Sequence, residues 1–414
     1  MDFIIGALSF FIFTSLYFQV FLLITYLENK NSFFRKQCQN KKPASGFLPS
    51  VTIIVPCWNE EKTVTKTLRS LSALNYPKEK LFIFVVDDGS IDGTKNAVKP
   101  FVENGLVKYF YKENGGKHTA LNLGINNAKT DLVGCLDADS FVSENALLAA
   151  VKELENPEIM TVTPAIKVHD PKTVIQRIQE TEYTIGIIFR KLLASINAQY
   201  VAPGPFSIYR RSVFNIVGKF KHAHNTEDME MAMRMQGFRL KLGNAFNAEV
   251  YTNTPATLRK LIRQRLRWTY GFIKNAIDYK FLLFKKGYGN IGFFSLPAAL
   301  ISIAAALYFA FYFARGVILF VYEKITYLST VGLNHALKFK FSWFFINTEV
   351  ITLLIYLSAA VFLILLTISI YHVRGRIFFK KSDVYFVLLY GLIAPLWMIR
   401  AVAQLILRQP SKWR

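Results

Sequence analysis

The sequence predicts one α/β domain flanked by transmembrane α-helices and by amphipathic helices at the membrane interface. Strand and helix signals alternate between about residues 49 and 256, which is typical of parallel β-α-β units. Four apolar stretches outside this block are long enough to cross a hydrocarbon core of about 30 Å. Hydrophobic residues make up 52% of the chain and its mean hydropathy is +0.26, which is unusual for a soluble protein.

The first element, residues 1–28, is predicted to be a transmembrane helix. Phe3 to Leu27 contains no charged residue and has neither the basic start nor the cleavage site of a signal peptide, so we expect it to be retained. A basic linker, residues 29–48, follows it. The linker's cations are Lys30, Arg35, Lys36, Lys41 and Lys42. Because lysine and arginine collect on the cytoplasmic side of membrane proteins, the linker predicts a cytoplasmic α/β domain.

The α/β domain, residues 49–256, opens with the β-branched run Val51 to Val55. Apolar residues at helical spacing follow from Glu61 to Leu74. Two further apolar runs, Leu81 to Val86 and Asp131 to Leu136, each lead directly into a pair of aspartates. In open parallel sheets ligands bind beyond the carboxyl ends of the strands, so we expect the acidic clusters to line a binding site.

Residues 257–288 are predicted to form an amphipathic helix region at the membrane interface. Apolar residues keep helical spacing from Thr257 to Lys285, and basic residues crowd the polar side: Arg259, Lys260, Arg263, Arg265 and Arg267. Binding of lipid headgroups is one interpretation of these cations. The other is that Gln264 and Arg267, three residues apart on one helical face, hold a pyrophosphate while Trp268 stacks on a sugar ring.

Residues 289–414 are predicted to contain about three membrane spans. The candidates are Ile291 to Ala314, Val350 to Tyr371, and Val384 to Ile399 with a continuation to Leu407. Basic residues mark a second cytoplasmic turn: Arg374, Arg376, Lys380 and Lys381.

Parity of these spans places the C-terminus outside, and its cations conflict with the positive-inside rule: Arg408, Lys412 and Arg414. Two explanations are open. One segment is re-entrant or interfacial, for which Ile325 to Phe345 is polar enough, or the tail is an exception.

The net charge of +22 has two explanations, and we favour a membrane over nucleic acid. The basic residues cluster beside apolar spans, where anionic headgroups attract them, and a phosphate-bearing substrate adds to the demand. No nucleic-acid partner is therefore expected. The three cysteines have no metal-ligand spacing, and Cys57 and Cys135 lie in apolar runs, so we expect buried thiols in a reducing compartment.

Two acidic clusters are candidates for binding a metal and a nucleotide. Asp137 and Asp139 offer hard oxygen ligands that suit Mg²⁺ or Mn²⁺ when substrate phosphates complete the shell, although a solvated loop is the alternative. Asp88, in the turn Asp87-Asp88-Gly89-Ser90, is placed to accept hydrogen bonds from a nucleobase imide or a ribose. The loop Pro56-Cys57-Trp58-Asn59-Glu60 follows the first strand in the same way.

Two helix starts carry further candidates. Gly115 and Gly116 let backbone amides approach an anion and Lys117 adds a cation, although a plain turn and helix cap fits the same residues. Thr226 is predicted to cap the helix that starts beside Glu227 and Asp228. The functional interpretation makes Asp228 a general base that deprotonates an attacking hydroxyl.

Taken in order, these motifs resemble the processive membrane-bound family-2 glycosyltransferases, which include cellulose, chitin, hyaluronan and poly-N-acetylglucosamine synthases. The motifs are Asp87-Asp88-Gly89-Ser90, Gly115-Gly116-Lys117, Asp137-Ala138-Asp139, Thr226-Glu227-Asp228 and Gln264-Arg265-Leu266-Arg267-Trp268. The resemblance covers about residues 48–285. Ala120-Leu121-Asn122 after the glycine-lysine motif is similar to the N-acetylglucosamine-using members, closest to poly-N-acetylglucosamine synthases.

The resemblance implies a Rossmann-like glycosyltransferase-A fold, an inverting transfer from a nucleotide sugar, and roles for particular residues. Asp228 would be the catalytic base, and Asp139 with Asp137 would bind Mg²⁺ or Mn²⁺. The implied substrate-binding residues are Glu60, Asp88, Lys117, Asp137, Gly204, Glu227, Gln264, Arg267 and Trp268. Gly204 belongs to a segment, Gly204 to Arg211, that looks like the family's acceptor side.

The resemblance also implies a function. The protein would be a multi-pass enzyme of the plasma membrane that polymerises a β-linked biofilm polysaccharide from UDP-N-acetylglucosamine and feeds it through its spans. Its partners would be the UDP-sugar, the growing polysaccharide, membrane lipid and small membrane or export proteins. We expect no cyclic-nucleotide-binding domain of the PilZ type after Leu407. The alternatives are a single transfer to a lipid-linked acceptor and an inactive scaffold subunit of an export complex.

Overall fold

The computed structural model describes residues 2–37, 46–331 and 349–408. In these residues one mixed sheet of eight strands forms the centre of the domain, in the order β3-β2-β1-β4-β7-β6-β8-β5. The strands are β1 (Val51–Cys57), β2 (Leu81–Asp88), β3 (Lys108–Lys112), β4 (Leu132–Cys135), β5 (Ser140–Val142), β6 (Ile159–Val168), β7 (Ser207–Arg210) and β8 (Lys241–Thr252).

The first half of the sheet is parallel, as the alternating signals predict. Strands β3, β2, β1 and β4 run the same way. They are connected through α2 (Val64–Ser72), α3 (Thr94–Glu103) and α4 (Lys117–Asn127). Their carboxyl ends therefore meet at one edge, where the predicted acidic motifs lie.

Helices cover both faces of this half-sheet and form its core. On one face Ile53 and Val55 pack with Leu68 and Leu71 of α2. On the other face α4 lies so close to β1 that a β-carbon on Gly124 would come within 2.7 Å of the Ile54 side chain. Glycine therefore sets the distance between α4 and the sheet, because any side chain there would force the two elements apart.

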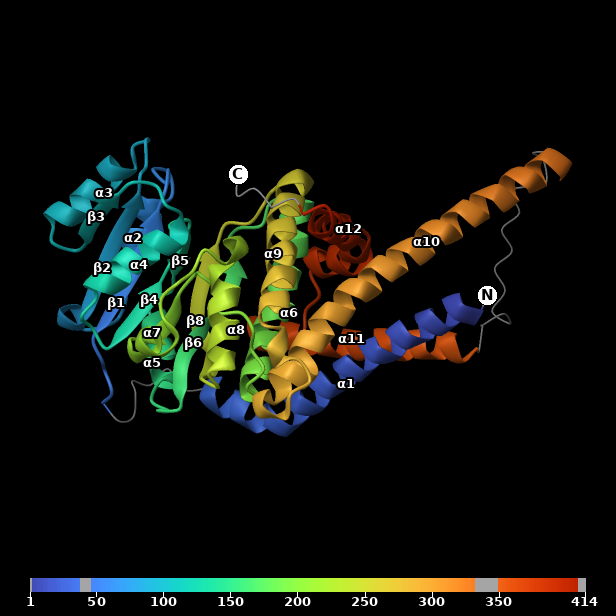
Figure 1. The fold of residues 1–414 in the computed structure, drawn as a ribbon, viewed down its shortest axis with the longest axis horizontal. Coiled ribbons are helices and arrows are strands. Elements are labelled where there is room, and N and C mark those ends of the chain that lie inside the picture. Colours follow the sequence, from blue (N-terminus) through green and yellow to red (C-terminus); the bar gives the residue numbers. More distant parts are fainter. Residues whose placement is uncertain (1, 38–45, 332–348, 409–414) are drawn as a thin grey trace.

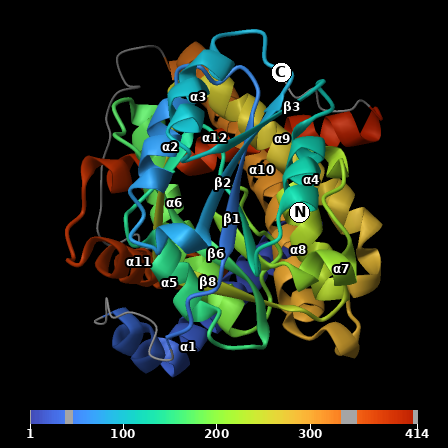
Figure 2. The same ribbon diagram turned by 90° about the vertical axis from the view of Figure 1, so that its left-hand side faces the viewer.

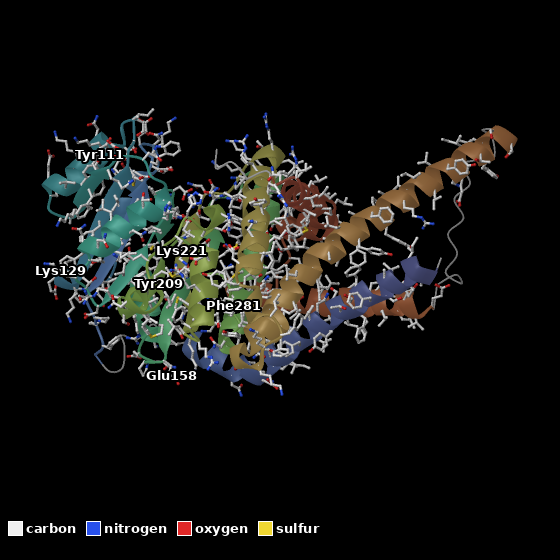
Figure 3. The ribbon with its side chains drawn as sticks, in the orientation of Figure 1. Tyr111, Lys129, Glu158, Tyr209, Lys221 and Phe281 are labelled. Atoms are coloured by element: carbon white, nitrogen blue, oxygen red, sulfur yellow. The ribbon has the colours of Figure 1, made fainter. Side chains whose placement is uncertain are left out.

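The second half of the sheet adds antiparallel strands. Strand β7 pairs antiparallel with β4 and β6, whereas β6 and β8 are parallel. Helices α5 (Ala146–Glu153), α7 (Ser212–Val217) and α8 (Glu227–Gly237) surround this half. Tyr209 of β7, labelled in Figure 3, is among the largest fully buried side chains of the protein.

Two long helices, α6 (Val174–Ser195) and α9 (Leu258–Asp278), lie between the sheet and the membrane helices (Figure 1). The predicted amphipathic helix thus exists, but it ends at Asp278 and not at Lys285. The chain turns there because Leu282 is buried with Ile291 in a cluster that continues into the membrane region. A one-turn 3₁₀ segment at Lys280–Leu282 makes this turn.

Four helices in the described residues are long and apolar enough to cross a membrane: α1 (Asp2–Gln37), α10 (Leu296–Val331, preceded by a π turn at Ile291–Ser295), α11 (Val350–Arg374) and α12 (Lys381–Ile406). They confirm the prediction of a multi-pass membrane protein with the α/β domain between its helices. Of the predicted interfacial helix at residues 325–345, Ile325 to Val331 continue α10, and the rest lies outside the described residues, as do Lys412 and Arg414.

Helix α12 is oriented differently from the other three apolar helices. Figure 1 shows it end-on beside α6 and α9, while α1, α10 and α11 extend away from the domain. Figure 2, turned by 90°, shows α12 lengthwise. Trp397 of α12 packs with Leu261 of α9, and Asp383 accepts a hydrogen bond from Thr181 of α6 at 2.7 Å. The turn before α12 therefore lies on the side of the α/β domain.

Candidate active site

A cavity of about 830 Å³ lies beyond the carboxyl ends of β1, β2 and β4 and extends to α6 and α9. It is lined by every residue that the sequence singled out for substrate, metal or catalysis: Glu60, Asp88, Lys117, Asp137, Asp139, Gly204, Glu227, Asp228, Gln264, Arg267 and Trp268. These residues come from parts of the chain more than two hundred positions apart. The structure thus brings the predicted residues together around one space.

At the sheet end of the cavity, Asp88 holds the glycine loop in place. Its carboxylate accepts hydrogen bonds from the backbone N–H of Gly115 at 3.0 Å and of Gly116 at 2.8 Å. Lys112, at the end of β3, forms an ion pair with the same carboxylate. Gly116 has a φ of +90°, a conformation that strongly favours glycine. The loop is therefore fixed before any ligand arrives.

Lys117 forms ion pairs with two carboxylates of the cavity. Its ammonium lies 2.6 Å from Asp137 Oδ1 and 3.3 Å from Glu227 Oε1, so it connects the end of β4 to the start of α8. Burial opposes its charge, but the two carboxylates raise its pKa above the ordinary value. A β-carbon on Gly204 would come within 2.8 Å of this ammonium, so the glycine leaves the room that the ion pairs need.

Asp139 is a carboxylate under electrostatic strain. Burial, together with the neighbouring carboxylates of Asp137 and Glu60, raises its pKa to about 6. A divalent cation would relieve this repulsion, and carboxylate oxygens are the ligands that Mg²⁺ and Mn²⁺ prefer. No three acidic, histidine or cysteine side chains cluster as a metal site in the described part of the chain. The repulsion at Asp139, with Asp137 beside it, fits a cation that a diphosphate helps to bind.

Asp228 has the properties of a general base. Burial and the adjacent Glu227 raise its pKa to about 6, which is close to the range in which a base works at neutral pH. Burial also opposes ionisation of Glu227, but Lys117 and Arg267 lower its pKa, so Glu227 ionises at a lower pH than Asp228. The pKa values of these two neighbouring carboxyl groups are thus shifted in opposite directions.

Thr226 was predicted to cap α8, but its side chain instead connects the segment Thr226-Glu227-Asp228 to α9. It precedes α8, but its side chain makes no capping hydrogen bond. Its hydroxyl donates to the Ala223 carbonyl at 3.1 Å and accepts a hydrogen bond from Asn275 at 2.9 Å. A β-carbon on Gly271 would overlap this hydroxyl, so α9 approaches as closely as it does only because residue 271 is glycine.

Arg265 was expected on the polar face of α9, and this is wrong. Its guanidinium is buried, forms an ion pair with Glu182 of α6 at 2.7 Å, and lies over the Trp268 ring at 4.3 Å. Tyr390 of α12 donates a hydrogen bond to the same glutamate at 3.0 Å. This cluster locks α9 to α6 and α12, because an unpaired charge there would be costly.

The sequence did not identify Lys112 or the cavity wall formed by α6. Lys112 carries no local signal, since only the pairing of β2 with β3 brings it to Asp88. The α6 residues do share a signal: Tyr183, Gly186 and Arg190 recur at helical spacing and line the cavity.

Comparison with known proteins finds a family similar to part of the α/β domain. Residues 52–218 match the family described as Glycosyl transferase family 2. The matched residues make up about two fifths of the chain. The matched segment holds most of the cavity residues, and the others come from α8 and the residues just before it, from the end of β8 and from α9.

Relatives of known name extend this result. The chain is 31% identical over 270 residues to the poly-beta-1,6-N-acetyl-D-glucosamine synthase of Staphylococcus aureus (strain COL), covering 62% of this chain and 64% of that protein. It is 31% identical over 227 residues to the protein of the same name from Staphylococcus epidermidis, covering 53% and 54%. The match thus spans somewhat less than two thirds of these relatives.

A solved structure supports the fold. The mannosyltransferase PcManGT from Pyrobaculum calidifontis, in complex with GDP-Man and Mn²⁺, superposes with a TM-score of 0.58 at 17% identity. The match covers 96% of this chain and 99% of that one. The expected glycosyltransferase-A fold, with its apolar helices, is thereby confirmed.

Proposed function

We propose that this protein is an inverting, processive glycosyltransferase that extends a β-linked polysaccharide, with UDP-N-acetylglucosamine as its donor. The observation that carries the proposal is the shape of the cavity. It joins a charged end, built from the sheet, to a wall of helices that pack against the membrane region. A long acceptor would leave the reacting centre directly beside those helices.

The charged end suits a sugar diphosphate. Asp139 and Asp137 would hold Mg²⁺ or Mn²⁺, which when bound offsets the negative charge that builds on the departing diphosphate. Lys117 and Arg267 add positive charge on the same side. The loop at Gly115 and Gly116 would lie against the nucleotide. These are the groups that electrostatic stabilisation of a departing UDP requires.

Asp228 would carry the proton transfer. An acceptor hydroxyl gives its proton to the Asp228 carboxylate as the oxygen attacks the anomeric carbon. The bond from that carbon to the diphosphate oxygen breaks as the new glycosidic bond forms, and UDP leaves with the electron pair. A single displacement of this kind inverts the anomeric configuration, so an α-linked donor gives a β-linked product. It needs one base, and the raised pKa of Asp228 suits that task.

The choice of N-acetylglucosamine rests on similarity. The Staphylococcus relatives are named for a β-1,6-linked N-acetylglucosamine polymer, and the match to them covers 62% of this chain. Growth of the polymer beside the spans would deliver it to the far side of the membrane, and further membrane or export proteins would assist.

We infer that α1, α10 and α11 cross the membrane, whereas α9 and α12 lie in the interface. The crosswise position of α12 supports this arrangement (Figures 1 and 2). It also removes the conflict over Arg408, because the C-terminus then returns to the side of the glycosyltransferase domain, which we assign to the cytoplasm.

The test is an assay of the purified protein in detergent or nanodiscs. UDP-N-acetylglucosamine, other UDP-sugars and GDP-mannose are supplied in turn with Mg²⁺ or Mn²⁺, and products are sized by mass spectrometry. We expect long chains from UDP-N-acetylglucosamine alone. Products with one added sugar would replace processive synthesis by single transfer, and absence of turnover with every donor would favour the scaffold role.

A further inference from the structure

Helix α6 separates the cavity from the membrane helices, and its two faces differ in character. Ile185 and Ile188 pack against apolar residues of α11, α12 and α1. The opposite face turns Tyr183, Gly186 and Arg190 toward the cavity. Arg190 therefore lies on the wall of the active site that is closest to the membrane.

Arg190 presents an unused hydrogen-bonding edge. Its Nε and Nη2 atoms are buried, and neither has a hydrogen-bond partner among the described residues. These two N–H groups point the same way along one side of the guanidinium, which is the fork that binds two oxygens at once. A β-carbon on Gly186 would lie 3.3 Å from Nη1, so the glycine makes room for the guanidinium beside the helix.

A buried guanidinium without a counter-ion is unfavourable unless something else satisfies it. Burial lowers the Arg190 pKa to about 10, with only Tyr183 acting in the opposite direction. The side chain is still protonated at neutral pH. Its charge and two donors are therefore available to a ligand, and the protein maintains them at a cost in stability.

The cavity's carboxylates do not satisfy Arg190. Lys117 interacts with Asp137 and Glu227 at the sheet end, and Arg265 is paired with Glu182. Two more buried atoms of cavity-lining residues have no hydrogen-bond partner in the described residues: Arg265 Nε, which is a donor, and Gln264 Oε1, which is an acceptor. A ligand for this end must therefore offer both oxygens and a hydrogen-bond donor, as a sugar with hydroxyl and acetamido groups does.

We propose that Arg190 forms an acceptor subsite in which its Nε and Nη2 donate to paired oxygens of a sugar in the growing polysaccharide. The paired oxygens are a hydroxyl and the carbonyl of a neighbouring N-acetyl group, and Gln264 accepts from a hydroxyl or amide of the same chain. The proposal rests on the proposed function, since it requires an acceptor glycan. It makes Arg190 a determinant of acceptor binding that is separate from the nucleotide site.

The test compares Arg190→Met and Arg190→Lys with the wild type in nanodiscs, using β-linked N-acetylglucosamine oligosaccharides as primers. Because hydrogen bonds to a charged donor are lost, we expect Arg190→Met to raise the primer KM by about 10- to 100-fold. Arg190→Lys keeps the charge without the fork and should be intermediate. The UDP dissociation constant should be unchanged in both. An unchanged primer KM, or an equal loss of UDP binding, would overturn the assignment.

A second measurement separates function from folding. Because Nε and Nη2 of Arg190 have no hydrogen-bond partner in the described residues, Arg190→Met should leave Tm unchanged or raise it. Arg265→Met is the matched control, because it breaks the pair with Glu182 and should lower Tm. A large fall in Tm for Arg190→Met would mean that the arginine is structural and would refute the proposal.

Modified primers identify the group that Arg190 binds. Wild-type protein should prefer an N-acetylated primer to a de-N-acetylated one, and Arg190→Met should abolish most of that preference. If an N-succinyl primer binds best and loses its advantage in the variant, the subsite is supported with a carboxylate as its ligand. Wild-type protein that elongates no primer would reject the proposed function itself, whereas elongation with no effect of Arg190→Met would reject only the subsite.

Discussion

The two ends of the cavity differ in how their polar groups are satisfied. At the sheet end, Asp88 accepts hydrogen bonds from Gly115 and Gly116, and Lys117 joins Asp137 to Glu227. At the membrane end, Arg190 and Gln264 keep buried polar atoms without partners among the described residues. The glycine loop and Lys117 are therefore held in the free protein, whereas Arg190 and Gln264 are not.

This difference suits the two substrates of a polymerase. A nucleotide returns in the same form at every cycle, so a rigid and pre-satisfied site lowers the cost of binding it. A polymer must be held and yet move by one sugar after each transfer. The wall between the cavity and the membrane carries hydrogen-bonding groups that only the ligand satisfies. Such groups can hold the polymer and still release it for the next step.

Asp228 stands where the two ends meet, and its loss should have the largest effect. Asp228→Asn should lower kcat by about 1000-fold because the base is gone, while the UDP dissociation constant stays close to that of the wild type. The same change should raise Tm at pH 7, since it removes a buried charge beside Glu227. Turnover assays, UDP titration and thermal melts check these results.

Asp278→Asn is the control for that variant, because Asp278 is an exposed partner of His224. It should resemble the wild type in all three measurements. Normal turnover by Asp228→Asn would remove Asp228 as the base.

Arg267→Ala should affect the sheet end and the reaction, but not folding. With less positive charge facing the diphosphate, we expect kcat/KM to fall by about 100-fold. Arg259→Ala, in the exposed first turn of α9, is the matched control and should be nearly normal. Wild-type polymer yield from Arg267→Ala would contradict a role at the pyrophosphate.

Activity should depend on the ionised form of Asp228. Because its pKa in the protein is raised to about 6, kcat/KM should be level above pH 7 and fall by roughly tenfold at pH 5. The contribution to stability has the opposite sign. A carboxyl group with a raised folded-state pKa favours the fold below about pH 4 and loses that contribution as pH rises through 6. A rate that is flat down to pH 5 would argue against this base.

Lys112→Met should affect the sheet end of the cavity alone, as Arg190→Met should affect the membrane end alone. Loss of its pairing with Asp88 frees the carboxylate that orders the glycine loop, so we expect UDP binding to weaken by about 5- to 10-fold. The primer KM should not change. Lys108→Met, on the same strand and exposed, is the control. A variant that weakens primer and UDP binding equally would show that the two ends are not independent.

Cysteine labelling tests the proposed orientation of α12. It reports on which side of the membrane a residue lies, and no change in reaction rate is expected. In a Cys38→Ser background, Arg376→Cys and Arg408→Cys should both be protected from an impermeant maleimide in intact cells, because α12 lies in the interface. Ser329→Cys, at the far end of α10, should be labelled. Opposite labelling of Arg376→Cys and Arg408→Cys would make α12 a fourth span.

Many features of the structure can be predicted from local sequence. The parallel strands, the apolar helices and the acidic turns at strand ends all have short-range periods and compositions that predict them, as Val51 to Val55 and Asp137 to Asp139 illustrate. Arg265 was misplaced because helical spacing identifies a polar face but not the Glu182 that buries it. Thr226 was misassigned for a similar reason, since its partner Asn275 lies 49 positions away.

The sequence alone determined the class of fold, the membrane attachment and the identity of the charged groups, because these depend on residue type and spacing within one element. Only the tertiary structure decided which charges are paired. Strand pairing brings Lys112 to Asp88, and contacts with α6 and α9 hold α12 across the other helices. The Nε and Nη2 atoms of Arg190 have no hydrogen-bond partner in the part of the chain that the structure describes. The pairing of charges depends on distances between elements of secondary structure. A polar group that is buried without a partner can form hydrogen bonds only when a ligand binds.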